Sequence, residues 1–328
     1  MHYCIIGCGA IARTHARHLA RLPGAELSFA SRSPAKAEEW RRKWCGTRAY
    51  GSYEAAFADP AIDAVVICTP HDRHAPLALA ALAAGKHAVI EKPMACTTAD
   101  ADAILATAES AQRQVLVAEN HHYRPHVRRM AEIARSGKLG RIKFIRIHVL
   151  RNRPFAAVEW RGDVSEMGGG ALIDGGIHWI NAMLTLADGA LEHLSAYGAS
   201  PTQPGEDSLA ITCRFASGEL GVLAYSWGVR GAFPQGFFSI HGSRGSAYCS
   251  NGGRLGLLST GGIPRPLIFP FRDWQGYGAM WRDFHDSLSS GRTPAMDGVA
   301  GRRDIAVVET IYRQIAQSSA PGRAASAS

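Results

Sequence analysis

The sequence Gly7-Cys8-Gly9-Ala10-Ile11-Ala12 decides the fold of the first part of the chain. A short apolar segment at residues 3–6 precedes it and a helical pattern follows, which is the context that a dinucleotide-binding turn requires. Gly7 permits a tight turn, Gly9 lets the backbone approach a pyrophosphate, and the small Ala12 lets the helix pack on the strand. The alternative is an ordinary strand-to-helix turn. We expect cofactor binding at Gly7, Gly9, Ala10, Ile11 and Ala12.

Short apolar strands alternate with helical segments in the first third of the chain. The expected strands are at residues 3–6, 26–30, 64–68, 87–90 and 115–119. This alternation predicts an α/β fold, a Rossmann domain with a doubly wound parallel sheet, over residues 1–120.

The pattern changes after residue 120. The sequence predicts a helix at 125–136, a strand at 142–150, a glycine-containing helix at 170–186, and strands at 191–199, 207–215, 219–227, 237–241 and 246–249. Consecutive strands without helices between them predict an α+β domain built on a largely antiparallel open sheet. A last helix at 299–316 closes this C-terminal domain, which we assign to residues 121–316. Residues 317–328 are too polar to pack, and we expect a disordered tail there.

Composition limits the class of protein. The 328 residues are 46% hydrophobic and 20% charged, which is typical of a globular protein with about two domains. The first strand begins too early for a signal peptide, and the longest apolar stretch, 75–84, is too short to cross a bilayer. The seven cysteines are odd in number and lack C-x-x-C spacing, so no disulfide framework or zinc ribbon is indicated. We expect a cytoplasmic protein that does not bind membranes.

The charge and the histidines of the chain suggest two other partners, nucleic acid and a metal ion. The net charge of +8 suggests nucleic acid, but the arginines between residues 124 and 153 are interleaved with apolar residues, and no nucleic-acid motif accompanies them. A solvated face or a pocket for an anionic cofactor is favoured instead. A metal ion is suggested by histidines, yet Arg73 stands beside two of them in a loop that should face the cofactor, so we expect no metal. The histidines are His71, His74, His121, His122 and His126.

Polar residues follow the expected parallel strands. Ligands of such sheets bind beyond the carboxyl ends of the strands, so these residues should gather at one edge. The candidates for cofactor binding there are Ser31, Arg32, Ser33, Thr69, Pro70, His71, His74, Glu91, Lys92 and Asn120, and the next residues, Tyr123 and Arg124, are candidates for substrate binding.

The glycine-containing helix of the second domain carries two ionisable residues. Asp174 and His178 lie four residues apart, so they share a face of an α-helix, and Asp174 could orient the imidazole. Gly175 and Gly176 each destabilise a helix by about 1 kcal/mol relative to alanine. Either the backbone there closely approaches a ring or sugar, or the glycines allow close packing of the helix.

Four motifs taken together resemble the Gfo/Idh/MocA oxidoreductase family, which includes glucose-fructose oxidoreductase and inositol dehydrogenase. They are the opening Gly-x-Gly-x-x-Ala, Glu91-Lys92-Pro93, Trp160-Arg161, and a Gly-Gly-x-x-x-Asp-x-x-x-His sequence that ends at His178. Over residues 2–316 the resemblance implies a Rossmann domain, an open sheet often used for oligomerisation, and hydride transfer to or from sugars, cyclic polyols or related carbonyl compounds. It also implies catalytic roles for Lys92 and His178, with Asp174 as their partner.

The chain departs from this family at two positions. Many members have an acidic residue after the second strand and an aspartate three residues after the histidine, where this chain has Ser31-Arg32 and Asn181. The second difference puts in doubt an acid role at that end of the helix.

Oxidation of a secondary alcohol requires a base for the hydroxyl proton while the carbinol hydrogen leaves as hydride. His178 is the expected base, and the Lys92 ammonium would stabilise negative charge on the oxygen. Cofactor contacts are also expected from Trp160 and Arg161. The expected substrate contacts are Lys92, Tyr123, Arg124, Arg153, Asp174 and His178.

The residues after the second strand predict the choice of cofactor. Arg32 can pair with a 2′-phosphate while Ser31 and Ser33 hydrogen-bond it, and no carboxylate follows the strand, so NADP(H) should be preferred over NAD(H).

An uncovered sheet face in the second domain predicts a homodimer or homotetramer. Two other functions stay open, a redox-cycling enzyme that retains its cofactor and a non-catalytic cofactor-sensing regulator. Lys92, Asp174 and His178 count against the regulator, and the sequence does not name the substrate.

Overall fold

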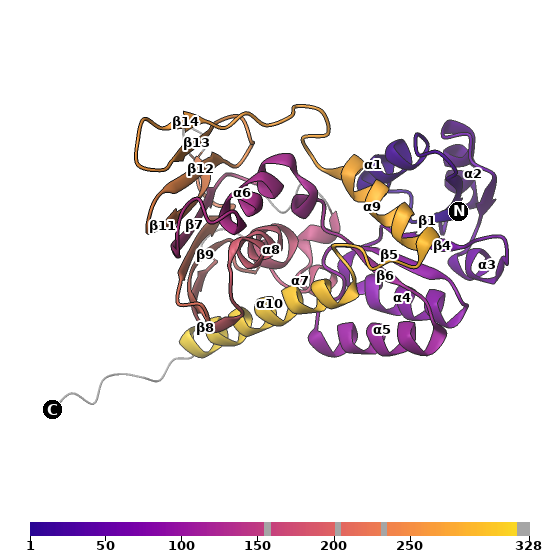
Figure 1. Cartoon of the computed structure of the whole chain (residues 1–328). Helices are drawn as coiled ribbons and strands as arrows, with labels where there is room; N and C mark the ends of the chain where they lie inside the picture. Colours follow the sequence, from indigo (N-terminus) through magenta and orange to yellow (C-terminus); the bar gives the residue numbers. More distant parts are fainter. Residues whose placement is uncertain (154–158, 201–204, 231–234, 320–328) are drawn as a thin grey trace.

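The computed structural model describes residues 1–153, 159–200, 205–230 and 235–319 and contains two β-sheets that lie side by side (Figure 1). The first sheet has six parallel strands in the order β3-β2-β1-β4-β5-β6, which confirms the doubly wound prediction. Winding changes direction between β1 and β4, where such sheets bind ligands. The strands are β1 (His2–Ile6), β2 (Glu26–Ala30), β3 (Arg48–Tyr50), β4 (Ala64–Ile67), β5 (His87–Glu91) and β6 (Val115–Ala118).

Helices lie on both faces of this sheet. The strands β1, β4 and β6 are buried along their whole length, as expected for apolar strands covered on both sides. The helical elements are α1 (Ala10–Leu19), α2 (Pro34–Lys43), α3 (Tyr53–Ala58), the 3₁₀ turn η1 (His71–Arg73), α4 (His74–Ala83) and α5 (Thr98–Ala111).

The second sheet has eight strands in the order β14-β13-β12-β11-β7-β10-β9-β8. Every neighbouring pair is antiparallel except β7 and β10, which run parallel, so the prediction of a largely antiparallel sheet is confirmed. The strands are β7 (Ile142–Leu150), β8 (Leu191–Ala199), β9 (Ser208–Phe215), β10 (Leu220–Ser226), β11 (Gln235–Gly242), β12 (Ser246–Ser250), β13 (Gly256–Ser259) and β14 (Arg265–Pro266).

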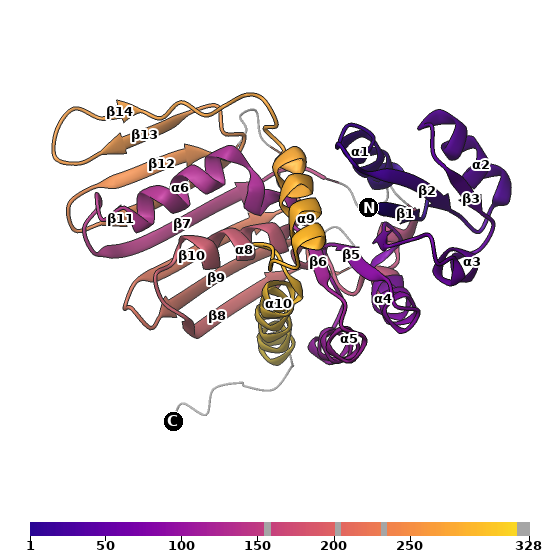
Figure 2. The same cartoon turned by 45° about the vertical axis from the view of Figure 1, so that its right-hand side comes forward.

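Helices α6 and α8 cover one face of the second sheet, and no helix of the described residues covers the other (Figure 2). Helix α10 extends to Ser319, into the region expected to be a disordered tail, and the rest of that tail, 320–328, lies outside the described residues. None of the described helices is long and apolar enough to span a membrane. The helical elements are η2 (Asn120–Tyr123), α6 (Pro125–Arg135), η4 (Glu159–Gly162), α7 (Val164–Met167), the π-helical turn η5 (Leu172–Gly176), α8 (Ile177–Leu186), α9 (Tyr277–Ser290) and α10 (Gly298–Ser319).

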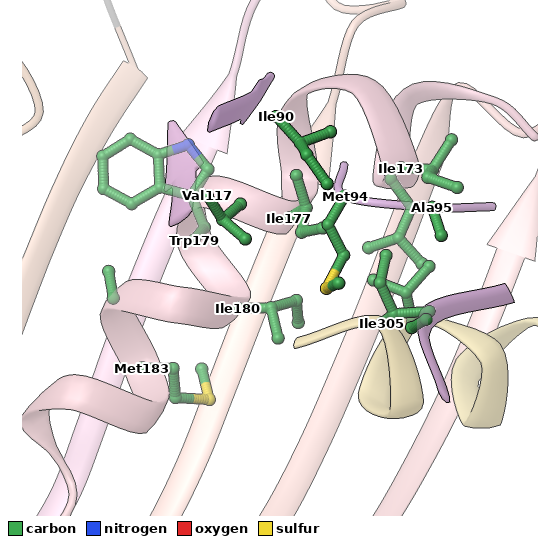
Figure 3. Close-up of a cluster of buried hydrophobic side chains, with 14 of the residues drawn as sticks. Ile90, Met94, Ala95, Val117, Ile173, Ile177, Trp179, Ile180, Met183 and Ile305 are labelled. Atoms are coloured by element: carbon green, nitrogen blue, oxygen red, sulfur yellow. The ribbon is translucent and has the colours of Figure 1, made fainter. Parts of the chain in front are cut away.

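A buried apolar cluster joins the two sheets (Figure 3). Ile90 and Met94 contribute from the end of β5, and Ile173 and Ile177 contribute from η5 and α8. Burial of an aliphatic side chain of this size contributes about 1.5–3 kcal/mol. Since Ile90 and Met94 bracket Lys92, and Ile173 and Ile177 bracket Asp174, this packing fixes the two polar residues next to each other.

Helix α9 lies late in the sequence but packs on the first sheet. Trp281 contacts the ring of Tyr3 edge-on at 5.5 Å, and α9 also packs against α1. The assignment of residues 121–316 to a single second domain stays a prediction, and α9 shows that this range also supplies core to the first sheet.

Candidate active site

The turn after β1 has the features of an anion-binding site. Gly7 has a φ of +94°, and a Cβ there would lie 3.0 Å from the carbonyl oxygen of Cys68. Helix α1 begins after Gly9 without a side-chain cap, and a Cβ on Gly9 would meet nothing within 4 Å. The Thr69 hydroxyl, across the turn, is buried and has no partner among the described residues. Open space, free helix N–H groups and an unpartnered hydroxyl together fit a pyrophosphate.

The predicted residues after β2 gather at the start of α2. The Ser31 hydroxyl accepts from the Ser33 amide at 3.2 Å, and the Ser33 hydroxyl accepts from the Lys36 amide at 3.4 Å. Arg32 is exposed, and its guanidinium lies near the hydroxyl of Tyr53. The Arg32 cation and Ser33 are therefore exposed at this end of the sheet, whereas Ser31 is buried.

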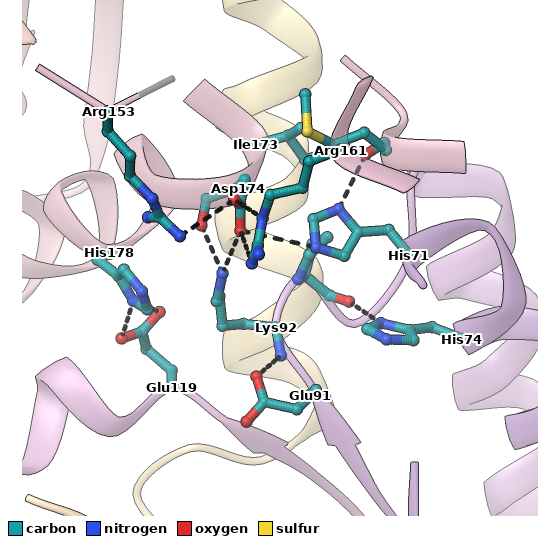
Figure 4. A network of polar contacts seen from close by, with 12 residues as sticks. His71, His74, Glu91, Lys92, Glu119, Arg153, Arg161, Ile173, Asp174 and His178 are labelled. Atoms are coloured by element: carbon teal, nitrogen blue, oxygen red, sulfur yellow. Dashed lines mark hydrogen bonds and ion pairs between the residues drawn. The ribbon is translucent and has the colours of Figure 1, made fainter. Parts of the chain in front are cut away.

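Asp174 is the centre of a cluster of cations (Figure 4). Lys92 Nζ donates to Asp174 Oδ1 at 2.9 Å and to the Asp174 carbonyl, and Arg161 Nε donates to Oδ2 at 2.6 Å. Arg153 Nη2 lies 3.9 Å from the carboxylate, and Nε2 of His71, a neutral ring because burial holds its pKa well below the usual value, lies 3.8 Å from it. Burial alone would raise the pKa of Asp174, but Lys92 and Arg161 hold that pKa well below its usual value. Asp174 is thus a fixed negative charge that positions the Lys92 ammonium.

His178 is paired with Glu119, which directly follows β6. Its Nδ1 lies 2.6 Å and 2.8 Å from the two carboxylate oxygens. Because a carboxylate accepts, Nδ1 carries the proton, and Nε2 of the neutral ring has a free lone pair. Burial lowers the pKa of His178, and this outweighs the opposite effect of Glu119. The imidazole is therefore neutral near pH 7, as a general base must be.

The hypothesis that Asp174 orients His178 is wrong, because Glu119 holds that position. Both carboxylate oxygens of Asp174 already accept from Lys92 and Arg161. The four-residue rule also assumes an α-helix, whereas Leu172–Gly176 forms a π-helical turn with a different hydrogen-bond spacing.

The two glycines of this turn allow close packing. A Cβ on Gly175 would lie 2.2 Å from the Tyr225 hydroxyl and 2.5 Å from the Trp227 ring, and one on Gly176 would lie 3.0 Å from Leu172. Of the two explanations that the sequence left open, the structure supports close packing against the end of β10.

Several predicted site residues hold loops in place. His74 faces the carbonyls of Thr69 and Pro93 with its two ring nitrogens, His71 Nδ1 lies 2.9 Å from the Met167 carbonyl, and the Trp160 ring packs edge-on against His71 at 4.8 Å. The Asn120 amide donates to the Gln275 carbonyl at 2.8 Å.

Tyr123 and Arg124 differ in their relation to the site. The Tyr123 hydroxyl donates to Asp283 at 2.6 Å, and its ring is buried against Phe284, so Tyr123 points away from His178. Arg124 is buried, stacks on Trp274 at 5.3 Å, and carries a charge that helps to lower the pKa of His178. The structure therefore brings Arg124, but not Tyr123, to the group around His178.

Glu91 belongs to a second carboxylate–histidine pair. Its Oε1 lies 2.7 Å from His15 Nε2, and its Oε2 accepts from the Lys92 amide at 3.1 Å. Trp281 donates its indole N–H to His15 Nδ1 at 3.1 Å. Since an indole N–H can only donate, His15 carries its proton on Nε2, and both of its nitrogens are occupied. Although burial opposes it, the bond from His15 lowers the pKa of Glu91.

The sequence reasoning missed Glu119, His15 and Trp281. Glu119 was placed inside the expected strand 115–119, which ends one residue earlier, at Ala118. A carboxylate that ends an otherwise apolar strand was the available signal, because such a residue is rarely buried without a partner. Glu119 is 1% exposed.

Glu119, His121 and His178 also form a group that could hold a metal ion, with ligand atoms within 4.8 Å of one another. The rings of His121 and His178 are stacked at 3.9 Å with an angle of 12°. Because imidazole lone pairs lie in the ring plane, stacked rings direct them in parallel and not toward one point. The arrangement favours proton transfer, and the absence of a metal stays a prediction.

Comparison with known proteins places this site in a family. Residues 1–119 match a family model described as "Oxidoreductase family, NAD-binding Rossmann fold", and residues 127–248 match one described as "GFO/IDH/MocA C-terminal domain". The chain is 30% identical to mouse trans-1,2-dihydrobenzene-1,2-diol dehydrogenase over 241 residues, which are 71% of this chain and 67% of that protein. It is 26% identical to D-apiose dehydrogenase of Rhizobium rhizogenes (strain K84 / ATCC BAA-868) over 97% of this chain and 95% of that one.

A solved structure of levoglucosan dehydrogenase in complex with NADH has the same fold. It superposes with a TM-score of 0.87 at 23% identity, over 97% of this chain and 98% of the other.

Proposed function

The chain belongs to the Gfo/Idh/MocA oxidoreductase family, and we propose that it transfers a hydride between NADP(H) and a secondary alcohol or ketone of a sugar, cyclic polyol or related small molecule. The observation that carries this proposal is a neutral, Glu119-held His178 near the Lys92–Asp174 ion pair, at the carboxyl edge of an NAD-binding Rossmann sheet. The residues proposed for chemistry are Lys92 and His178, with Asp174 and Glu119 as positioning residues.

The cofactor assignment rests on two places. The free N-terminus of α1 and the unpartnered Thr69 hydroxyl fit the pyrophosphate. Arg32, flanked by Ser31 and Ser33, fits a 2′-phosphate and has no acidic residue beside it that would favour a free ribose hydroxyl. These features support NADP(H) over NAD(H).

A bound nicotinamide supplies a hydride acceptor or donor. During oxidation of an alcohol, His178 Nε2 takes the hydroxyl proton, and the Glu119 carboxylate stabilises the imidazolium that forms. The Lys92 ammonium, held by Asp174, donates a hydrogen bond to the oxygen as negative charge develops on it. In reduction, protonated His178 returns the proton to the same oxygen.

The substrate class is supported by the names of the relatives. D-apiose dehydrogenase, 1,5-anhydro-D-fructose reductase and myo-inositol 2-dehydrogenase are among the proteins that this chain resembles. These names indicate carbinol and ketone carbons of sugars and cyclic polyols.

A panel of sugars, polyols and sugar acids tests the proposal when each is incubated with the full chain and NADP⁺ or NAD⁺. The expected result is stoichiometric formation of reduced cofactor with at least one substrate, and a higher kcat/KM with NADP⁺. Product formation without net cofactor reduction would favour the redox-cycling alternative. Cofactor binding without turnover on any panel member would contradict hydride transfer and favour the regulator.

We also propose a homodimer or homotetramer that pairs the uncovered face of the second sheet. Tyr248 and Leu257 are 40% and 47% exposed on neighbouring strands, and Tyr248 stacks on Phe237 of β11. An apolar face of this kind is typical of a subunit interface.

All seven cysteines are free, which fits the proposed cytoplasmic location.

A further inference from the structure

Two arginines extend from the end of β7 toward the reaction site. Arg151 directly follows this strand, Arg153 lies two residues further on, and Trp227 directly follows β10. Because β7 and β10 run parallel, their carboxyl ends lie at the same edge of the sheet, and the glycine-containing turn η5 packs there. The guanidinium of Arg153 lies 4.4 Å and that of Arg151 5.6 Å from the centre of the buried Trp227 ring.

Hydrogen bonds to the Tyr225 hydroxyl hold Trp227 and Arg151 in place. Trp227 donates its indole N–H to the Tyr225 hydroxyl at 2.5 Å, and Arg151 Nη2 bonds the same hydroxyl at 3.2 Å. Tyr225 and Trp227 are both 0% exposed, whereas Arg151 is exposed and Arg153 half-exposed. The two aromatic residues therefore form a buried base under two more exposed guanidinium groups.

The cations around the site outnumber its carboxylates. Lys92, Arg153 and Arg161 share the single carboxylate of Asp174. Arg124 and Arg151 have no carboxylate of the described residues within 4 Å, and Glu119 is bonded to His178. Of these two cations without a carboxylate partner, Arg124 is buried and Arg151 is exposed, and together with the three that share Asp174 they give the site an excess of positive charge. A bound anion would reduce this excess of positive charge.

The position of Arg153 points to the substrate and not to the cofactor. The cofactor phosphates are proposed to lie at α1 and Arg32, on the first sheet, whereas Arg151 and Arg153 come from the second. In Figure 4, Arg153 enters from the side of His178, and Arg161 enters from the side of His71. A molecule whose hydroxyl reaches His178 would therefore have its neighbouring substituent next to Arg153.

We propose that the substrate carries an oxyanion beside its reacting carbon, and that Arg151 and Arg153 bind it. Sugar acids and sugar phosphates share this chemistry, since a guanidinium forms paired hydrogen bonds with either group. The proposal rests on the proposed function, because it places the anion relative to His178. It narrows the substrate class to anionic sugars and cyclic polyols.

Calorimetric titration of the NADP⁺-saturated full chain tests this with three matched groups of ligands. The neutral group is glucose, galactose and myo-inositol, the carboxylate group is gluconate, glucuronate and galacturonate, and the phosphate group is glucose 6-phosphate and galactose 6-phosphate. At least one anionic ligand should bind about tenfold or more tightly than every neutral ligand, a difference of about 1.4 kcal/mol. Tighter binding of a carboxylate or of a phosphate identifies which anion the site takes.

Arg151→Gln and Arg153→Gln should each weaken binding of the preferred anionic ligand by about tenfold, and should weaken binding of the neutral ligands by a smaller factor, so that most of the preference is lost. Arg129→Gln is the matched control, since Arg129 is an exposed residue of α6 paired with Glu132, and it should keep the preference. Thermal melting of each variant excludes loss of fold.

The proposal is overturned if no anionic ligand exceeds the neutral ones, if none binds, or if both site variants keep the preference. Failure of the proposed function would give a different result. Anionic ligands would still bind, and Arg151→Gln would still weaken that binding, but no substrate of the panel would reduce the cofactor.

Discussion

Two carboxylate–histidine pairs lie at the ends of neighbouring parallel strands. Glu91, the last residue of β5, pairs with His15, and Glu119, which follows β6, pairs with His178. His15 is 0% exposed, and Trp281 occupies its second nitrogen. His178 retains 13% exposure of its side chain, and its Nε2 has no protein partner among the described residues. The same two groups therefore form a structural pair where both nitrogens are occupied and the proposed proton-transfer site where one is free.

The largest expected effect is a loss of turnover at the pair with the free nitrogen, Glu119 with His178, and at the neighbouring Lys92. His178→Ala removes the proposed base and Lys92→Ala removes the proposed hydrogen-bond donor to the substrate oxygen, so each should lower turnover by about 10²–10⁴. NADPH affinity should change little, because neither residue is assigned to the phosphates. Steady-state kinetics with fluorescence titration of NADPH measures both quantities, and near-normal turnover in either folded variant would refute its role.

A smaller effect, on cofactor affinity, is expected at Arg32, which follows β2. Arg32→Ala should weaken NADP(H) binding by about tenfold or more and spare NAD(H), because a charge-assisted hydrogen bond contributes about 1.5–3 kcal/mol. Arg42→Ala is the control, since Arg42 lies at the other end of α2 and pairs with Glu38 at the surface. Equal loss of affinity for both cofactors would contradict a contact with the 2′-phosphate.

The smallest effect on turnover is expected at His15. His15→Ala leaves the Glu91 carboxylate and the Trp281 N–H without their partner in a buried place, which destabilises the fold by about 1–3 kcal/mol. Thermal melting should show a drop of a few degrees, while turnover of the folded variant falls by less than about tenfold. The exposed His193→Ala is the control. If His15→Ala abolished turnover while leaving the melting temperature unchanged, the distinction between the two pairs would fail.

The sequence predicted the parallel strands well, because buried strands are continuous apolar runs with turn residues after them. Strands β3 and β14 have only three and two residues, too few for a pattern to be visible. Helix α9 was overlooked although Tyr277, Met280, Trp281, Phe284 and Leu288 show helical spacing, so its periodicity could have been found.

The candidate site was predicted where motif and strand end coincide, as at Lys92. The partner of His178 was not, since Glu119 lies 59 residues away and the packing of η2 against α8 brings the two together. Charges compete for partners in space, and spacing along one helix does not show which carboxylate reaches a given imidazole. Asp174 was therefore assigned to the wrong neighbour, although its place beside Lys92 makes it a positioning residue.

The dependence of kcat/KM on pH, measured for alcohol oxidation by the unmodified chain and by Glu119→Gln, tests the central claim most directly. The pKa of His178 lies below 6.5, and only the neutral ring accepts a proton, so the unmodified chain should keep its activity down to pH 6.5 and lose it below. Glu119 favours the protonated ring, so its replacement by the neutral Gln should lower the pKa of His178, shift the acid limb to lower pH, and reduce the plateau by about tenfold or more. An acid limb that stays in place, or one that moves to higher pH, would contradict the account of Glu119-held His178 as the base.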